Sequence, residues 1–266
     1  MLLKYWLKFN SLLVPLIVVS LCFLAIAGLQ LPNLNLILDK SKNATIDELK
    51  KDIEVEKERL KLIKNLPSFG FNNLIANWVM LNFIQYFGDD PVRDRTGYDL
   101  SPDYFEIIIE RDPRFFESYV YLSTSITMYA GKPEKSVALM EKGLNFLSPE
   151  MIGKYYYIWR YKGIDELLFL GNAKAAQKSF EMAAKWASIR PDRESQNVAA
   201  LSQRTAGFLS KNPNSKSAQV GAWAMVLGNA VDDRVRQLAI DRIQKLGGKV
   251  TVTPETGVQV ALPKED

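Results

Sequence analysis

An uninterrupted apolar run near its start is the clearest hydrophobic pattern in the chain. The nineteen residues from Ser11 to Leu29 carry no charge, and as a helix they would span about 28 Å, close to the hydrocarbon thickness of a bilayer. Lys4 and Lys8 precede the run, and the next charged residue after it is Asp39. Because cytoplasmic flanks carry the excess of basic residues, we expect a single-pass membrane helix with its N-terminal side in the cytoplasm.

Two other interpretations of this segment stay open. Ala25-Ile26-Ala27 before Gly28 has the small residues of a signal-peptide cleavage site, although the apolar run is long for such a peptide and favours an uncleaved anchor. A lipidated Cys22 is less favoured, because Leu21 is too large for the position before a lipidated cysteine. The sequence does not decide whether the segment is cleaved or which membrane it enters.

From Thr45 onward the apolar positions recur with the period of helices. Thr45 and Glu48 form a capping box, which predicts a helix start. Apolar residues then recur at a/d spacing to about residue 64, over fewer than three heptads, which favours packing against the next helix over a coiled-coil dimer. The apolar segment from Phe71 to Phe87 is too short and too rich in Asn and Gln for a second membrane span, so we expect a core helix.

Polar residues, Gly and Pro predict the remaining boundaries. Gly88 to Leu100 is expected to be a thirteen-residue polar loop. A helix should follow, with Ser101 as its N-cap and Pro102 as its first helical residue, ending at Asp112 before a proline. Further helices are expected over residues 192–210, 215–229 and 232–246, and the tail after them is either a small hairpin or loose.

A forty-residue repeat appears in the middle of the chain when Gly131 is aligned with Gly171. Small, large and small residues then recur in one register. The repeat-packing positions are Gly131, Ser136, Met140 and Gly143 in the first unit, and Gly171, Ala176, Phe180 and Ala183 in the second. Each unit reads as an apolar helix, a glycine turn, a second helix and a proline, so helix pairs are expected.

This order of small and bulky positions resembles the tetratricopeptide repeat, in which small residues on the second helix let the first helix approach closely. The junction from Asp112 to Phe115, with Tyr119 four residues later, is similar to the family's corner between repeats. The prolines are 36 to 42 residues apart, where the family uses about 34, and Trp159 and Tyr161 only approximate its first-helix consensus. The resemblance implies an all-α fold, a transmembrane helix followed by an α-solenoid of helix-turn-helix repeats.

Five regions follow from these boundaries. They are an N-terminal membrane anchor (1–38), a linker with an amphipathic helix (39–66), the tetratricopeptide-like repeats (67–191), a C-terminal helical repeat or cap (192–248) and a tail (249–266).

Composition limits the chemistry. The chain has no histidine and one cysteine, which rules out Ser-His-Asp and Cys-His catalysis and histidine-ligated zinc or haem. Its 34 basic and 30 acidic residues are mixed along the chain, unlike the clustered basic face of a nucleic-acid-binding protein. No phosphate-binding loop or nucleophile-elbow motif is present. We therefore expect neither an enzyme nor a cofactor, metal or nucleic-acid partner.

Two groups of residues with acidic side chains are candidate sites. The charges between Asp89 and Arg95 could bind a cation or a basic segment, but a solvated loop with internal ion pairs is the simpler interpretation. Asp165 and Glu166 are adjacent, so their carboxylates diverge around a helix and would not face one reacting atom. We expect Asp165 and Glu166 to belong to an ordinary polar face.

In the resembled family the first helix of each pair lines a concave groove that binds a peptide. By that analogy the peptide-groove candidates are Asn73, Asn77, Tyr119, Ser123 and Arg160. Asn73 and Asn77 are four residues apart and share a helical face, where paired amides can bond a peptide backbone or instead bridge helices.

The sequence thus predicts a membrane-anchored scaffold that binds one or more proteins of a membrane complex and aids its assembly or stability. The segment from Leu66 to Gly70 before the Asn-rich helix is similar in style to anchored repeat proteins of cyanobacteria. That resemblance implies a bacterial inner membrane or a thylakoid, and a photosynthetic complex. The alternatives are a permanent structural subunit, and a small-molecule-binding protein with an apolar inner surface.

Overall fold

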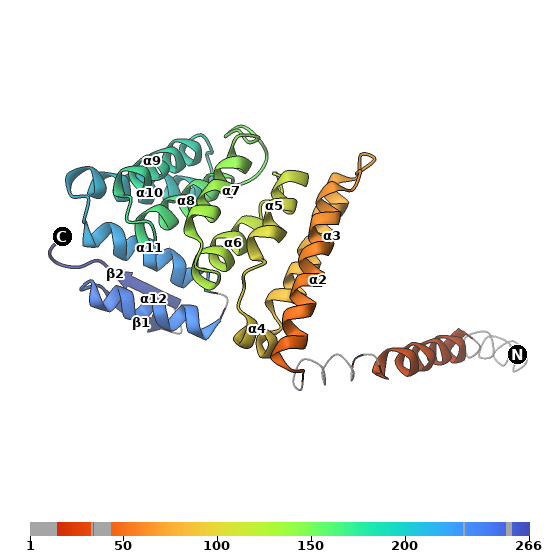
Figure 1. The fold of residues 1–266 in the computed structure, drawn as a ribbon. Coiled ribbons are helices and arrows are strands. Elements are labelled where there is room, and N and C mark those ends of the chain that lie inside the picture. Colours follow the sequence, from red (N-terminus) through yellow and green to blue (C-terminus); the bar gives the residue numbers. More distant parts are fainter. Residues whose placement is uncertain (1–14, 33, 35–43, 231, 254–256) are drawn as a thin grey trace, which may run out of the picture. The chain divides into compact units, whose positions relative to one another are not determined.

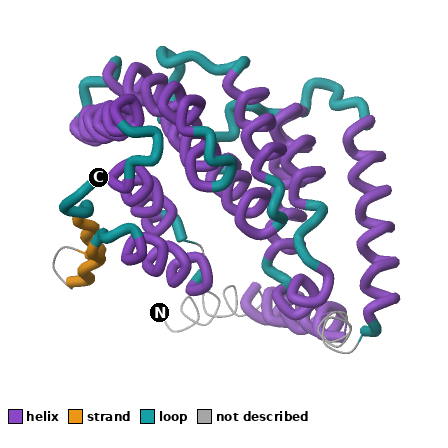
Figure 2. Tube along the Cα trace, turned by 60° about the vertical axis from the view of Figure 1, so that its left-hand side comes forward, coloured by secondary structure: helices purple, strands orange, loops and turns teal. Residues whose placement is uncertain are grey.

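The computed structural model describes residues 15–32, 34, 44–230, 232–253 and 257–266 (Figure 1). These residues are helical apart from connecting segments and one short hairpin. The first helices are α2 (Ile46–Asn65), α3 (Asn72–Phe87), α4 (Asp90–Thr96), α5 (Ser101–Arg111), α6 (Ser118–Ser123) and the π-helix η1 (Thr124–Tyr129). They are followed by α7 (Pro133–Leu144), α8 (Tyr156–Leu168), α9 (Ala173–Ser188), α10 (Arg193–Lys211), α11 (Lys216–Gly228) and α12 (Asp233–Lys245). Strands β1 (Lys249–Thr253) and β2 (Gly257–Ala261) form an antiparallel hairpin, orange in Figure 2.

Contacts divide the chain into two compact units, residues 1–52 with 89–96, and residues 53–88 with 97–266. The first unit contains the helix Pro15–Pro32, whose large apolar side chains are exposed. This helix is long and apolar enough to cross a membrane. The expected span thus has a helix of suitable length and composition, while Ser11 and the basic flank lie outside the described residues.

Helix α4 corrects the expected loop between Gly88 and Leu100. Asp90 and Pro91 begin this helix, an acidic residue and a proline in the first turn, where both are favourable. Val92 is buried beside Ala44 and Leu49 in a small apolar cluster of the first unit. The polar composition concealed a helix because one apolar side chain is enough to dock so short an element. The predicted capping box is present, since Thr45 N–H donates to the Glu48 carboxylate at 2.8 Å.

In the second unit successive helices pack on their neighbours, α7 on α8, α8 on α9, α9 on α10, α10 on α11 and α11 on α12. In Figure 1 these helices follow one another in chain order. The hairpin packs on α12 through β1. Side chains from α2 to α10 form the main apolar cluster, and smaller clusters lie where α8 and α9 meet α10 and α11, and between α11, α12 and the hairpin.

The repeat-packing positions have similar surroundings in the segments that follow Gly131 and Gly171. Gly131 and Gly171 end the first helix of each pair with φ of +65° and +62°, a conformation that favours glycine. Ser136 and Ala176, Met140 and Phe180 are buried on the second helices, as is Ala183. A Cβ on Gly143 would overlap the hydroxyl and ring of Tyr119, so glycine is required where α7 crosses α6.

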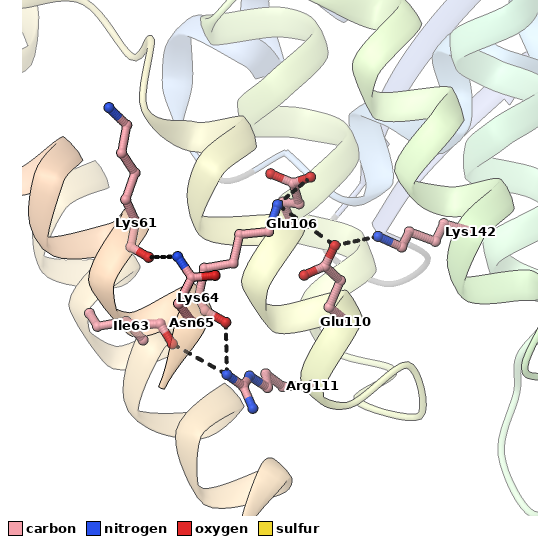
Figure 3. Close-up of polar contacts among 8 residues, drawn as sticks. All are labelled: Lys61, Ile63, Lys64, Asn65, Glu106, Glu110, Arg111 and Lys142. Atoms are coloured by element: carbon pink, nitrogen blue, oxygen red, sulfur yellow. Dashed lines mark hydrogen bonds and ion pairs between the residues drawn. The ribbon is translucent and has the colours of Figure 1, made fainter. Parts of the chain in front are cut away.

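The end of α2 is fixed to α5 by polar contacts (Figure 3). The Arg111 guanidinium donates to the backbone oxygens of Ile63, Lys64 and Leu66, at 3.3, 2.9 and 2.6 Å. It thereby satisfies carbonyls that the helix end leaves without partners. The Lys64 ammonium lies 2.8 Å from the Glu106 carboxylate, and Glu110 bridges Lys64 and Lys142. These contacts join the end of α2 to α5, and Glu110 connects α5 to α7.

Each of the last three helices begins after a residue whose side chain caps it. Asp192, Ser215 and Asp232 each accept the backbone N–H three residues later, at the starts of α10, α11 and α12. The expected N-cap at Ser101 is wrong, because Leu100 takes that position and Ser101 is the first helical residue. Its hydroxyl is buried and without a hydrogen-bond partner among the described residues, so core packing overrode the local capping preference.

We predict that Gly143→Ala lowers the free energy of unfolding by about 1–3 kcal/mol, because the new methyl group would force the fully buried Tyr119 from its site. Gly207→Ala in α10 is the matched control, since a Cβ there has nothing within 4 Å. It should raise stability by up to about 1 kcal/mol through helix propensity. Urea unfolding followed by circular dichroism measures both variants, and equal effects of the same sign would contradict the close approach.

Candidate functional site

A cavity of about 750 Å³ opens between α8, α10, α11 and the C-terminal hairpin. Tyr157, Arg160 and Tyr161 line it from α8, and Leu201, Arg204 and Phe208 line it from α10. Val260 and Leu262 close one side from β2 and the tail. Its volume lies within the range of pockets that bind ligands in proteins.

Small residues on α11 leave the space for this cavity. Ser217, Gly221, Ala224 and Gly228 line it and recur every three or four positions, so they share one helical face. Ala218 and Ala222, on the neighbouring face, are buried in the cluster shared with α8 and α9. The helix therefore uses one row of small side chains for packing and the other to leave a hollow.

The cavity wall is aromatic and basic. The Arg160 guanidinium lies over the ring of Tyr157, 5.9 Å from its centroid, and the Arg204 guanidinium lies over Phe208 at 5.4 Å. Lys154 forms an ion pair with Glu194, and the Tyr157 hydroxyl donates to the same carboxylate at 3.2 Å. Glu194 is the only acid among the lining residues that the structure describes, and its contacts with Lys154 and Tyr157 already engage it.

A smaller pocket of about 30 Å³ lies beside this cavity and shares Val120, Tyr161, Met225 and Asn229 with it. That volume is large enough to hold a water molecule. Ser123 and Asp165 also line this pocket, so it places a buried carboxylate next to the cavity.

Three hydroxyls surround Asp165. Its carboxylate accepts from Ser123 of α6 at 2.9 Å, from Thr127 of η1 at 2.7 Å and from Ser136 of α7 at 2.6 Å. Burial raises the pKa of Asp165 to about 7, and the three hydrogen bonds offset part of that effect. The π-helical turn brings Thr127 to the carboxylate, so Asp165 ties α8 to three preceding elements.

Glu166 points to α9 instead. Its carboxylate accepts from Ser179 of α9 at 2.6 Å and pairs with the Lys162 ammonium at 2.6 Å. The expectation of an ordinary polar face is wrong for both acids, because Asp165 is only 1% exposed and Glu166 only 3% exposed. The expectation that they do not face one atom agrees with these separate partners.

Only part of the predicted groove lies on the cavities. Arg160 lines the large cavity and Ser123 the small pocket. Tyr119 corrects the prediction, because it is fully buried, donates its hydroxyl to the Pro113 carbonyl at 2.8 Å and packs over Gly143. Its ring fills the core at the helix corner and is not available to a peptide. Asn73 and Asn77 are exposed on α3.

The exposed side of α3 is a second surface, which we call the α3 outer face. Leu74, Trp78 and Leu81 are 63%, 46% and 61% exposed there, at the spacing of one helical face. Asn73 and Asn77 flank them, and the whole of α3 contains no charged residue. An exposed helix face with apolar side chains and no charge is typical of an interaction surface.

The sequence contained a weak signal for the residues that were missed. Asp165 and Glu166 stand in an otherwise apolar helical stretch, where an acid is either exposed or fully satisfied. Their hydroxyl partners lie 13 to 42 positions away in the chain, so only the fold brings these groups together. Among the described residues no group of His, Cys, Asp or Glu side chains is arranged to hold a metal ion.

We predict that Asp165→Asn changes the pH dependence of stability. The raised pKa means that the folded protein keeps a proton that the unfolded chain releases, so wild-type stability falls between about pH 4 and pH 7. The fall attributable to this group is at most about 4 kcal/mol. In Asp165→Asn that contribution should vanish, and its stability relative to wild type should rise with pH over the same interval.

Urea unfolding from pH 4 to pH 8 measures this difference. Asp233→Asn is the control, because the Asp233 side chain is exposed on α12. Parallel pH profiles for wild type and Asp165→Asn would contradict a buried, titrating carboxylate.

Comparison of the chain with protein-family models, with curated proteins and with solved structures finds no match.

Proposed function

We propose that this protein is a membrane-anchored scaffold of tetratricopeptide-like repeats that binds a segment of another protein in its cavity. On this proposal the paired helices form an α-solenoid, and the scaffold assists the assembly or stability of a membrane protein complex. The single observation that carries the proposal is the open, aromatic and basic cavity between α8, α10 and α11.

The arrangement of the cavity supports binding. Its walls are helices whose opposite sides are buried in apolar clusters, so the exposed side chains are held by a packed framework. A framework ordered in advance loses little conformational freedom on association. Four aromatic residues and two arginines line the cavity, and these residue types are the ones most enriched where proteins bind one another.

The helix Pro15–Pro32 supports attachment to a membrane. A tether confines the search for a partner to the neighbourhood of the bilayer and so raises the effective concentration. We place the N-terminal side in the cytoplasm and the membrane as a bacterial inner membrane or a thylakoid, where a photosynthetic complex would be the partner. The basic flank and the sequence style described above support this placement.

A photo-crosslinking amino acid at Leu201 tests the proposal with the full-length protein in its native membranes. Leu201 lines the cavity and is half exposed, so a partner in the cavity would lie within reach. We expect one discrete protein adduct at this position. The same amino acid at Lys178, exposed on α9 and outside the cavity lining, should give none. Equal labelling from both positions, or an adduct with lipid or a small molecule at Leu201, would contradict protein binding in the cavity.

A permanent structural subunit is a second candidate, favoured by the α3 outer face. Obligate interfaces are large and more apolar than transient ones, and Leu74, Trp78 and Leu81 would remain uncovered in a free protein. A permanent subunit should co-purify at fixed stoichiometry after detergent extraction. An assembly factor should be substoichiometric and enriched in incomplete complexes.

For the permanent subunit we predict that Leu74→Gln/Leu81→Gln releases the protein from the complex during extraction, with stability changed by less than about 0.5 kcal/mol per site because both side chains are exposed. Val55→Gln on α2 is the control, since Val55 is exposed outside the α3 outer face. Quantitative gel filtration and mass spectrometry measure retention. Full retention of the double variant would count against this surface as a permanent interface.

A further inference from the structure

We propose that the cavity takes an acidic peptide segment, in which a carboxylate binds Arg160 and Arg204 and the flanking apolar side chains lie against the aromatic wall. This inference rests on the proposed function and specifies the chemistry of the partner.

Arg160 is the first reason. Its Nε atom is enclosed and has no hydrogen-bond partner, and the side chain forms no ion pair within the described part of the chain. Arg160 is half-buried, and a cation that is partly withdrawn from water normally has a counter-charge, because desolvation without one is costly. Burial also lowers the pKa of the Arg160 guanidinium, as expected for a cation that lacks an acidic neighbour. A carboxylate from outside would supply both the charge and the acceptor.

The charge of the wall is the second reason. Among the described lining residues, Lys154, Arg160 and Arg204 stand with a single acid, Glu194, which is paired with Lys154. Arg204 has a ring contact with Phe208 and no ion pair among the described residues. Two guanidinium groups that line the cavity, from α8 and α10, thus have no carboxylate partner among the described residues and are available to a ligand. Guanidinium groups match the planar geometry of a carboxylate.

The apolar part of the wall indicates what accompanies the acid. Leu201, Phe208, Met225 and Leu262 line the same cavity as the two arginines. A small free anion would leave these side chains uncovered, whereas Asp or Glu flanked by apolar residues would cover them and neutralise the charge. Burying apolar surface beside a charge-assisted hydrogen bond combines affinity with orientation.

Selection from a library of random peptides tests the inference without knowledge of the partner. The full-length protein in lipid discs is the bait, and enriched peptides are sequenced. We expect enrichment of Asp and Glu beside apolar residues on the wild type. That enrichment should be lost on Arg160→Gln and Arg204→Gln and kept on Lys178→Gln, which removes the same charge outside the cavity.

The best peptide and its Asn or Gln counterpart are then compared by fluorescence anisotropy. Wild type should bind the acidic peptide at least tenfold more tightly than Arg160→Gln does, about 1.4 kcal/mol. The amide counterpart should lose little further on Arg160→Gln, because the two changes remove the same interaction. Arg204 is exposed, so Arg204→Gln provides a variant whose folding is not at issue if Arg160→Gln unfolds, and circular dichroism checks both.

Each other outcome is informative. Selected peptides that lack acidic residues but crosslink to the cavity through Leu201 would overturn this inference. They would leave intact the proposal that the cavity binds a protein segment. A failure to select any peptide would count against both. Displacement of the acidic peptide by inorganic phosphate at far lower concentration than by acetate, at equal ionic strength, would overturn a carboxylate ligand in favour of a phosphate.

Discussion

The fold of the second unit depends on helices that approach closely enough for an aromatic ring of one to lie over a glycine of the next. Tyr119 lies over Gly143, and at Gly163 an added Cβ would lie 3.1 Å from the ring of Phe180. Packing at this distance buries both rings, excludes a methyl group at Gly143 and leaves little room for one at Gly163. These contacts set how closely α7 approaches α6 and how closely α9 approaches α8.

Close packing also explains why polar groups are built into the interior. Where α8 meets its neighbours, Asp165 and Glu166 bond to hydroxyls and a lysine that come from different elements. Apolar contacts alone tolerate small slips of one helix along another. A carboxylate that needs three hydroxyls in place does not, because a misplaced partner leaves a buried charge unsatisfied. Asp165 and Glu166 therefore bind α8 to both its preceding and its following helix.

The two surfaces available for association differ in chemistry. The cavity is concave, basic and aromatic, whereas the α3 outer face is a helix face without charge. A flexible or extended acidic segment suits the first and a complementary apolar surface suits the second. A protein with both can hold one partner while it presents another site to a second. Two such surfaces suit the proposed role in a complex of several subunits.

The sequence alone determined the features that depend on local pattern. The apolar segment before residue 32, the capping box at Thr45 and the glycines at 131 and 171 follow from hydrophobicity or backbone preference, and the hairpin was one of two open outcomes for the tail. The tertiary structure decided the rest. Tyr119 is in the core and Arg160 on the cavity, although both were assigned to one groove, because helix packing sets which side of an element is covered. The burial of Asp165 was hidden because the hydroxyls that surround it are distant in the chain. Helix α4 was hidden because its apolar packing involves one side chain, Val92, against Ala44 and Leu49.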